Sequence, residues 1–264
     1  MQDPVRIGVI GGAGWLGGAL AGSILKDGVA RPEGLSLSYR RQRPARFPEA
    51  HWTQDNQELV DRSDIIIVSV RPADWPALSV DVGDRLVISV MAGIRLEQVG
   101  THHRTKRVAR ALPNAAAEAG KSYTPWIAAG GLNESDRAAV RRIFGACGVE
   151  DEFSRESDID YLTGLTGSGP AFPALLAAAM MKDAIGHGLS MDVARRAVNT
   201  MLVGAGRLLE LRDDCPNDIV NSFLDYRGTT AAAIEAMRAS GLEKAVSEGL
   251  SAAFRKSVSM GEAS

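Results

Sequence analysis

The sequence predicts an α/β fold with a doubly wound, mostly parallel sheet in its first half and an all-α helical fold in its second half. Short apolar or β-branched segments alternate with helical patterns up to residue 156. One of them, "IIIVSV" at Ile65–Val70, is apolar on both faces, which is typical of a parallel strand covered on both sides. After residue 157 Ala, Leu, Met and Gly dominate and strand patterns end. We therefore expect two domains, residues 1–156 and residues 157–264.

The expected strands of the first domain share short length and apolar or β-branched composition. They are Val5–Ile10, Leu35–Tyr39, Ile65–Val70, Leu86–Val90 and Val108–Leu112. The longest connections between them carry helical patterns, so the units alternate as in a doubly wound sheet.

The second domain shows helix start and stop signals. One helix is expected to begin at Ser168 or Gly169, with Pro170 in its first turn, and to end near Gly186. A long amphipathic helix follows Ser190 as its N-cap and runs through Arg212. Three more are expected after Pro216, over Thr229–Ser240 and over Leu242–Val258.

Composition excludes several function classes. The chain has 264 residues and a net charge of -2, so no overall basic field attracts nucleic acid or anionic lipid. No apolar run reaches the roughly 20 residues that span a bilayer, and "MQDPVR" does not begin a signal peptide. The two cysteines, Cys147 and Cys215, lack the spacing of metal ligands. We expect a cytoplasmic protein with no metal site.

Seven glycines lie within "RIGVIGGAGWLGGALAGSIL", Arg6–Leu25. Gly12, Gly14 and Gly17 have the spacing G-x-G-x-x-G directly after a predicted strand and at the start of a predicted helix. In a Rossmann-type domain these glycines permit a tight turn, contact with a pyrophosphate and close packing of helix on strand. The alternative is a tight turn that binds nothing. The predicted cofactor contacts here are Gly12, Ala13, Gly14, Trp15, Leu16 and Gly17.

The end of the second predicted strand indicates which dinucleotide binds. NAD-binding domains usually place a carboxylate there for the ribose 2′-hydroxyl. This chain has "LSLSYRRQR" instead, with Ser38, Arg40, Arg41 and Arg43. Arginines suit a 2′-phosphate, so we expect Ser38, Arg40 and Arg41 to favour NADPH over NADH. A solvated basic loop is the alternative.

Five segments carry a family resemblance: "VRPADW", "SVMAGI", "RALPN", "DYLTGLTGSGPAF" and "RGTTAAAIEAM". In this order and at these separations they resemble the pyrroline-5-carboxylate reductase family, over nearly the whole chain from Ile7 to about Leu250. "TGSGPAF" and "RGTTAAAI" are the most specific pair. The resemblance implies NADPH-dependent reduction of the C=N bond of 1-pyrroline-5-carboxylate to L-proline, and a homodimer or higher oligomer formed through the helical domain.

The resemblance also implies site residues. Thr230 would hydrogen-bond the ring nitrogen of the substrate as the catalytic residue, and Ser168 would lie near the substrate carboxylate. Gly228 and Thr229 would join Thr230 at the start of a helix, where free N–H groups can hold an anion. A plain N-cap is the alternative for Ser168 and both threonines, and a turn cap is the alternative for Asn114. The further cofactor contacts that it implies are Val70, Arg71, Pro72, Ala92 and Asn114.

The chain departs from the family pattern at several positions. Gly11 lengthens the glycine loop by one residue, and Arg71 replaces the usual lysine. Asp225-Tyr226-Arg227 replaces the usual Ser-Pro-Gly before the last glycine and the double threonine. Arg227 either clamps a second carboxylate or lies in solvent. The alternatives are therefore a reductase of another cyclic imine or a non-catalytic NADPH-binding regulatory protein.

A β-hydroxyacid dehydrogenase is disfavoured. Those enzymes need a lysine one to two turns into the first helix of the second domain. In this chain "PAFPALLAAAMM", Pro170–Met181, contains no lysine before Lys182.

Overall fold

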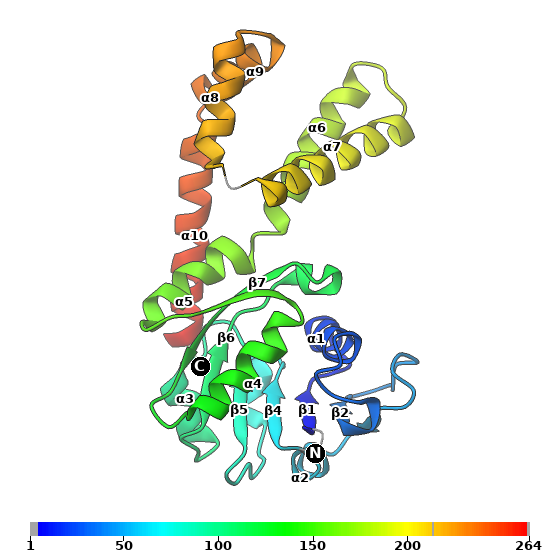
Figure 1. Ribbon diagram of the computed structural model, residues 1–264, viewed down its shortest axis with the longest axis vertical. Coiled ribbons are helices and arrows are strands. Elements are labelled where there is room, and N and C mark those ends of the chain that lie inside the picture. Colours follow the sequence, from blue (N-terminus) through cyan, green and yellow to red (C-terminus); the bar gives the residue numbers. More distant parts are fainter. Residues whose placement is uncertain (1–4, 213, 263–264) are drawn as a thin grey trace. The chain divides into compact units, whose positions relative to one another are not determined.

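The structure is a computed structural model that describes residues 5–212 and 214–262 (Figure 1). Within these residues eight strands form one sheet, in the order β3-β2-β1-β4-β5-β6-β7-β8. Strands β1 to β6 pair in parallel, whereas β7 is antiparallel to β6 and parallel to β8. The strands are β1 (Ile7–Ile10), β2 (Leu35–Ser38), β3 (His51–Thr53), β4 (Ile65–Val68), β5 (Leu86–Ser89), β6 (Val108–Ala111), β7 (Ser122–Ala128) and β8 (Gly148–Glu152). The predicted doubly wound sheet is confirmed.

Both faces of the sheet are covered, which explains the continuous apolar strands. Every residue of β1, β4 and β5 is buried. Alternate residues such as Ile7 and Val9 belong to one core with α1 (Trp15–Lys26) and α4 (Glu134–Gly145). The residues on the opposite face of the sheet, such as Ile66 and Val68, belong to a second core with α2 (Asn56–Asp61) and α3 (Leu96–His102). The period of two along each strand sends neighbouring side chains to opposite faces.

Sequence patterns missed β3, β7 and β8. Strand β3 has only three residues, and β7 contains Pro125. Strand β8 reads "GVEDE" and pairs on one side only, with β7. Charged residues are common on such edges because they discourage pairing with other chains. Tertiary pairing therefore creates these strands from residues with weak strand propensity.

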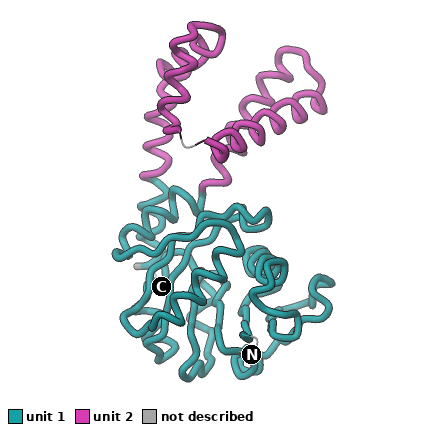
Figure 2. Tube along the Cα trace, in the orientation of Figure 1, with its two compact units in different colours: residues 1–168, 252–264 teal, residues 169–251 magenta. Residues whose placement is uncertain are grey.

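The chain forms two compact units (Figure 2). Unit 1 comprises residues 1–168 and 252–264, and unit 2 comprises residues 169–251. Helix α5 (Glu156–Leu162) remains with unit 1 because Ile159 packs against Leu112 and Ile127. A π-helical turn, Thr163–Gly167, follows it. The expected division into a cofactor domain, residues 1–156, and a substrate domain, residues 157–264, stays a prediction.

Unit 2 is helical, as the sequence predicts. Helix α6 (Ala171–Gly186) packs against α7 (Met191–Leu211), and α8 (Pro216–Tyr226) packs against α9 (Thr229–Ala239). The hydroxyl oxygen of Ser190 accepts a hydrogen bond from the Val193 N–H at 3.4 Å, which confirms the predicted N-cap of α7. The cap of α6 is Pro170 rather than Ser168 or Gly169.

Helix α10 (Leu242–Glu262) runs from unit 2 into unit 1. Its last turns belong to unit 1, where the Gln98 side-chain amide donates to the Gly261 carbonyl at 3.2 Å. Close approach explains Gly93, since an added Cβ would lie 2.8 Å from the Cβ of Met260. Across the described residues, no helix has the length and apolar character needed to cross a membrane.

A buried ion-pair network joins β6 to α5. The Arg110 side chain is 0% exposed, and its Nη2 donates to Asp160 Oδ1 at 2.6 Å. Its Nη1 donates to Glu156 Oε1 at 3.1 Å. Both carboxylates are needed because a buried guanidinium is costly when unpaired.

We predict that Asp160→Ala lowers the free energy of unfolding by roughly 3 kcal/mol, because Arg110 then stays buried with its charge only partly compensated. Urea denaturation measures the change. Asp158→Ala is the matched control, since its partner Arg155 is 73% exposed and the loss of such a pair should cost less than about 1 kcal/mol. Equal effects of the two substitutions would contradict the role given to the network.

Candidate functional site

The glycine loop joins β1 to α1 by a very close approach. Gly11 has φ +85°, a conformation that favours glycine. A Cβ at Gly17 would lie 2.5 Å from the Gly11 carbonyl oxygen, and one at Gly12 would lie 2.9 Å from the Leu37 side chain. Gly12 and Gly17 are therefore explained by packing, and Gly11 by backbone conformation.

The start of α1 presents free N–H groups. Gly14 is its N-cap, and no side chain caps the helix. The first turn contains no acidic residue. Unsatisfied N–H groups and the positive end of the helix dipole make such a terminus suitable for a phosphate.

A groove of about 1050 Å³ lies beside this terminus, at the carboxyl ends of β1, β2 and β4. The strand order reverses direction between β1 and β4, and open α/β sheets bind ligands at such a switch point. Seven of the predicted cofactor residues line the groove: Ala13, Gly14, Ser38, Arg40, Arg41, Val70 and Arg71. The structure does not place Gly12, Trp15, Leu16, Gly17, Pro72, Ala92 or Asn114 in its lining. The cofactor roles of all these residues stay predictions.

The groove is positively charged. Arg40, Arg41 and Arg71 line it, and Asp74 is the sole carboxylate among its described lining residues. Asp74 Oδ2 lies 2.8 Å from Arg40 Nη2, although Arg40 is 74% exposed. An exposed pair of this kind is weak, so an incoming phosphate can replace the carboxylate. The net charge favours an anionic ligand.

Ser38 has a structural contact that sequence patterns do not reveal. Its hydroxyl oxygen accepts the Gly11 N–H at 2.9 Å, and its carbonyl accepts the Ala13 N–H at 3.0 Å. Ser38 thus holds the glycine loop against the end of β2.

Asn114 takes the turn-capping position that was one of its two expected roles. Its Oδ1 accepts the Ala116 N–H at 2.9 Å, and its Nδ2 donates to the Thr166 carbonyl at 3.0 Å. It is buried and links the end of β6 to the π-helical turn before Ser168. The Ser168 hydroxyl donates to the Thr163 carbonyl at 3.4 Å, and Ser168 ends the π-helical turn rather than acting as the N-cap of α6.

Sequence reasoning missed Trp75 and His103. Of the adjacent histidines at 102 and 103, His102 is exposed, whereas His103 is only 4% exposed. The Trp75 indole N–H donates to His103 Nε2 at 3.3 Å. Trp75 lies in the 3-10 segment Pro72–Ala77, whose Ala73, Asp74 and Ala77 line the groove. The buried Trp75–His103 pair therefore anchors one wall of the groove to α3.

In unit 2, α9 begins with two threonines whose side chains do not cap the helix. Gly228 is the N-cap, and neither Thr229 nor Thr230 caps the helix, so the plain capping alternative is wrong. Within the described part of the chain neither hydroxyl has a hydrogen-bond partner, and both residues are exposed. The first main-chain bond is from the Ala232 N–H to the Gly228 carbonyl, so the preceding N–H groups are free.

The segment before Gly228 differs from an ordinary turn. Arg227 has φ +53°, an uncommon conformation for a residue with a side chain. The Tyr226 side chain is 84% exposed, and its ring lies close to Gly228. A Cβ at Gly228 would lie 3.0 Å from that ring, so a side chain at this N-cap would displace the exposed Tyr226 ring slightly.

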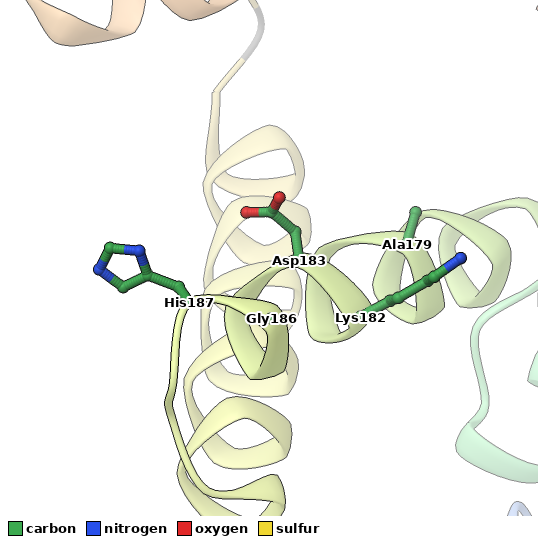
Figure 3. A pocket seen from close by; sticks show the side chains of 5 residues that line it. All are labelled: Ala179, Lys182, Asp183, Gly186 and His187. Carbon is green, nitrogen blue, oxygen red and sulfur yellow. The ribbon is translucent and has the colours of Figure 1, made fainter.

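A hollow in unit 2 is lined by polar side chains that do not point toward a common centre. It is lined by Ala179, Lys182, Asp183, Gly186 and His187. Figure 3 shows the Lys182 and His187 side chains pointing in different directions from α6, with Asp183 between them and directed toward neither. This divergence is that of a helix surface rather than a site. The structure also contains no cluster of metal-ligating side chains among the described residues.

We predict that His103 makes the protein less stable in acid. Burial lowers the pKa of His103 to about 4, and His102 contributes to the lowering. The unfolded chain, with a pKa near 6.5, then binds more protons, so the free energy of unfolding falls as the pH drops from about 6.5 to about 4, by up to roughly 3 kcal/mol. Urea denaturation at several pH values measures this slope.

His103→Gln should flatten the slope, because Gln keeps an acceptor for Trp75 and does not titrate. His187→Gln, at an exposed position, is the control and should leave it unchanged. If the free energy of unfolding of the His103 variant fell with pH as steeply as that of the wild type, titration of His103 would not be the cause.

Comparisons with known proteins agree with this two-part arrangement. Residues 156–260 match the family model "Pyrroline-5-carboxylate reductase dimerisation", and residues 6–93 match "NADP oxidoreductase coenzyme F420-dependent". The chain is 28% identical to the pyrroline-5-carboxylate reductase of Synechocystis, over 98% of this chain and 99% of that protein. It is 29% identical to pyrroline-5-carboxylate reductase 2 of Bacillus subtilis, over 91% and 90%.

Solved structures share the fold. A pyrroline carboxylate reductase of Plasmodium falciparum, crystallised with NADP bound, has a TM-score of 0.85 at 23% identity and covers 99% of both chains. A pyrroline-5-carboxylate reductase of Coxiella burnetii has a TM-score of 0.86 at 22% identity, covering 98% of this chain and 99% of that one. The helical half therefore matches the pyrroline-5-carboxylate reductase dimerisation model, and the chain is similar over nearly its whole length to proteins named pyrroline-5-carboxylate reductase.

Proposed function

We propose that this protein uses NADPH to reduce the C=N bond of 1-pyrroline-5-carboxylate, giving L-proline. The observation that carries the proposal is the start of α9, where two threonine hydroxyls and free N–H groups lie together without a partner among the described residues. A small cyclic imino acid carries both groups that such a helix start can bind, a carboxylate and a ring nitrogen. The curated relatives of this protein are named pyrroline-5-carboxylate reductase.

The groove of unit 1 fits a phosphorylated dinucleotide. Its glycine loop has no room for side chains at Gly12 and Gly17, and the free N–H groups of α1 suit a pyrophosphate. Arg40 and Arg41 would hold the 2′-phosphate, since no described carboxylate other than Asp74 lines the groove. When bound, NADPH supplies the hydride.

The residues of the chain bind and orient the imino acid. The free N–H groups at the start of α9 would hold the carboxylate, and the Thr230 hydroxyl would hydrogen-bond the ring nitrogen. An imine protonated on nitrogen is already electrophilic, so alignment matters more than an acid–base pair. This agrees with the lack of a side-chain dyad among the described residues of α9.

Arg227 and Tyr226 favour a second candidate, reduction of a different cyclic imine. They replace the Pro-Gly of the family pattern directly before Gly228. The Arg227 side chain has no hydrogen-bond or ion-pair partner in the part of the chain that the structure describes. A guanidinium placed there suits a substrate with a second carboxylate.

We further propose that the protein is a homodimer formed through unit 2. The matching family model is described as a dimerisation region. Large apolar side chains of α6 and α7 are exposed, including Leu175, Val203 and Leu211 at 73, 68 and 80%. Exposed apolar surface of this extent marks an association surface.

A reducing compartment such as the cytoplasm suits the two free cysteines.

Oxidation of NADPH, followed at 340 nm with a panel of cyclic imines, tests the proposed function. Turnover is expected with 1-pyrroline-5-carboxylate. Turnover with a dicarboxylic cyclic imine only would favour the second candidate. NADPH binding without turnover of any imine would overturn both and leave a binding protein.

Thr230→Val should lower kcat by roughly 10- to 100-fold, because the ring nitrogen loses its hydrogen-bond partner in the transition state. Cofactor affinity should change little. Steady-state kinetics and fluorescence titration separate the two effects. Thr101→Val, at an exposed position of α3 in unit 1, is the control. Unchanged kcat in the Thr230 variant would remove its assigned role.

Replacing Arg40 and Arg41 together by Ala should weaken NADPH binding by roughly 10- to 100-fold and NADH binding only slightly, because only NADPH carries the 2′-phosphate. Titration with both dinucleotides gives the ratio of their dissociation constants. Arg31→Ala is the control, since Arg31 is exposed and does not line the groove. A constant ratio would overturn the phosphate assignment.

A further inference from the structure

Arg46 binds the glycine loop from outside the groove. It lies in the connection between β2 and β3, and it is not among the residues that line the groove. Its Nη2 donates to the carbonyl oxygens of Gly12, Ala13 and Gly14, at 3.2, 3.0 and 2.8 Å. One guanidinium therefore fixes three successive peptide units of the loop that leads into α1.

The space for Arg46 comes from Gly18 in α1. A Cβ at Gly18 would overlap the guanidinium carbon and both terminal nitrogens of Arg46. Gly22, about one turn further along the same helix, has no such restriction, since its Cβ would lie 3.5 Å from the Phe47 ring in ordinary contact. The glycine at position 18 therefore leaves room for Arg46.

The backbone next to Arg46 is held in an unusual conformation. Phe47 has φ +53°, which costs energy for a bulky residue. The Trp52 indole N–H donates to the Phe47 carbonyl at 3.1 Å, and the Arg43 guanidinium donates to the Pro48 carbonyl at 3.1 Å. The guanidinium of Arg46 also lies 5.8 Å from the centre of the Phe47 ring. These contacts fix the segment that carries Arg46.

The charge of Arg46 has no counter-ion within the described residues. No carboxylate pairs with it, and its Nε is buried without a hydrogen-bond partner there. It lies beside Gly18 in the first turns of α1, where the helix dipole is already positive and the first turn has no acid. The charge of Arg46 therefore adds to the positive end of this helix, which favours an anion there.

We infer that Arg46 is a positioning residue for the pyrophosphate of the dinucleotide: it holds the glycine-loop carbonyls outward and adds positive charge at the start of α1. The inference rests on the proposed dinucleotide function. The pyrophosphate is common to NADPH and NADH, so Arg46 acts on both equally. This distinguishes it from Arg40 and Arg41, which would act on NADPH alone.

The test uses Arg46→Gln, Gly18→Ala and the double variant, in the full-length protein, with Gly22→Ala as the matched control on the same helix. Dissociation constants for NADPH and NADH are measured by fluorescence titration, and thermal unfolding checks folding. Arg46→Gln should raise the dissociation constants for NADPH and NADH by the same factor. This factor should be about tenfold, because a charged hydrogen-bond donor is lost.

Gly18→Ala should reproduce that loss, because the new methyl group displaces the guanidinium. The double variant should bind no worse than Arg46→Gln, since both changes remove the same contact. Gly22→Ala should bind like the wild type. Arg46→Lys, which keeps the charge but cannot bridge three carbonyls, should recover only part of the affinity.

Other outcomes separate the inference from the function on which it rests. A wild-type protein that binds neither dinucleotide overturns both. Wild-type binding with unchanged affinity in a folded Arg46→Gln variant overturns the inference alone. Loss of NADPH binding but not of NADH binding would make Arg46 a 2′-phosphate ligand instead. Additive losses in the double variant would separate Gly18 from Arg46 and also overturn it.

Discussion

The close approach of α1 to the end of β1 is the constraint on which the cofactor half of this protein depends. The Gly11 carbonyl lies so near the helix that position 17 accepts no side chain, and Gly12 is confined by Leu37. Only this spacing brings the first turn of α1 to the carboxyl edge of the sheet. The groove, its arginines and the wall anchored by Trp75 are arranged around that edge.

Contacts that fix the loop come from two other places in the chain. Ser38 at the end of β2 accepts the Gly11 N–H, and Arg46 in the following connection binds three loop carbonyls. Between them they satisfy donors and acceptors on both sides of the loop. A loop held in this way keeps its N–H groups in position before a ligand arrives, which reduces the ordering cost of binding.

Unit 2 is stabilised differently from unit 1. Its helices bury few residues, among them Ala194, Val198 and Ala231, and many large apolar side chains are exposed. A helical unit with so little core of its own is typical of an association surface. The free start of α9 belongs to this unit, so substrate binding and assembly draw on the same group of helices in our proposal.

Local patterns in the sequence determined the doubly wound sheet, the helical second half and the glycine loop. Apolar runs, caps such as Ser190 and the spacing of Gly12, Gly14 and Gly17 are local signals, and they act over a few residues. They also indicated the groove residues Arg40 and Arg41, because strand ends are recognisable, and the family resemblance added Arg71. Strands β3, β7 and β8 carried no such signal, since their pairing partners lie elsewhere in the chain.

Only the tertiary structure decided which residues meet across long separations. It buried His103 beside Trp75, paired Arg110 with Asp160, placed Arg46 on the glycine loop and left the Thr229 and Thr230 hydroxyls free of capping. The physical reason is that hydrogen bonds, ion pairs and burial depend on distance in space, while a sequence pattern reports only on neighbours along the chain.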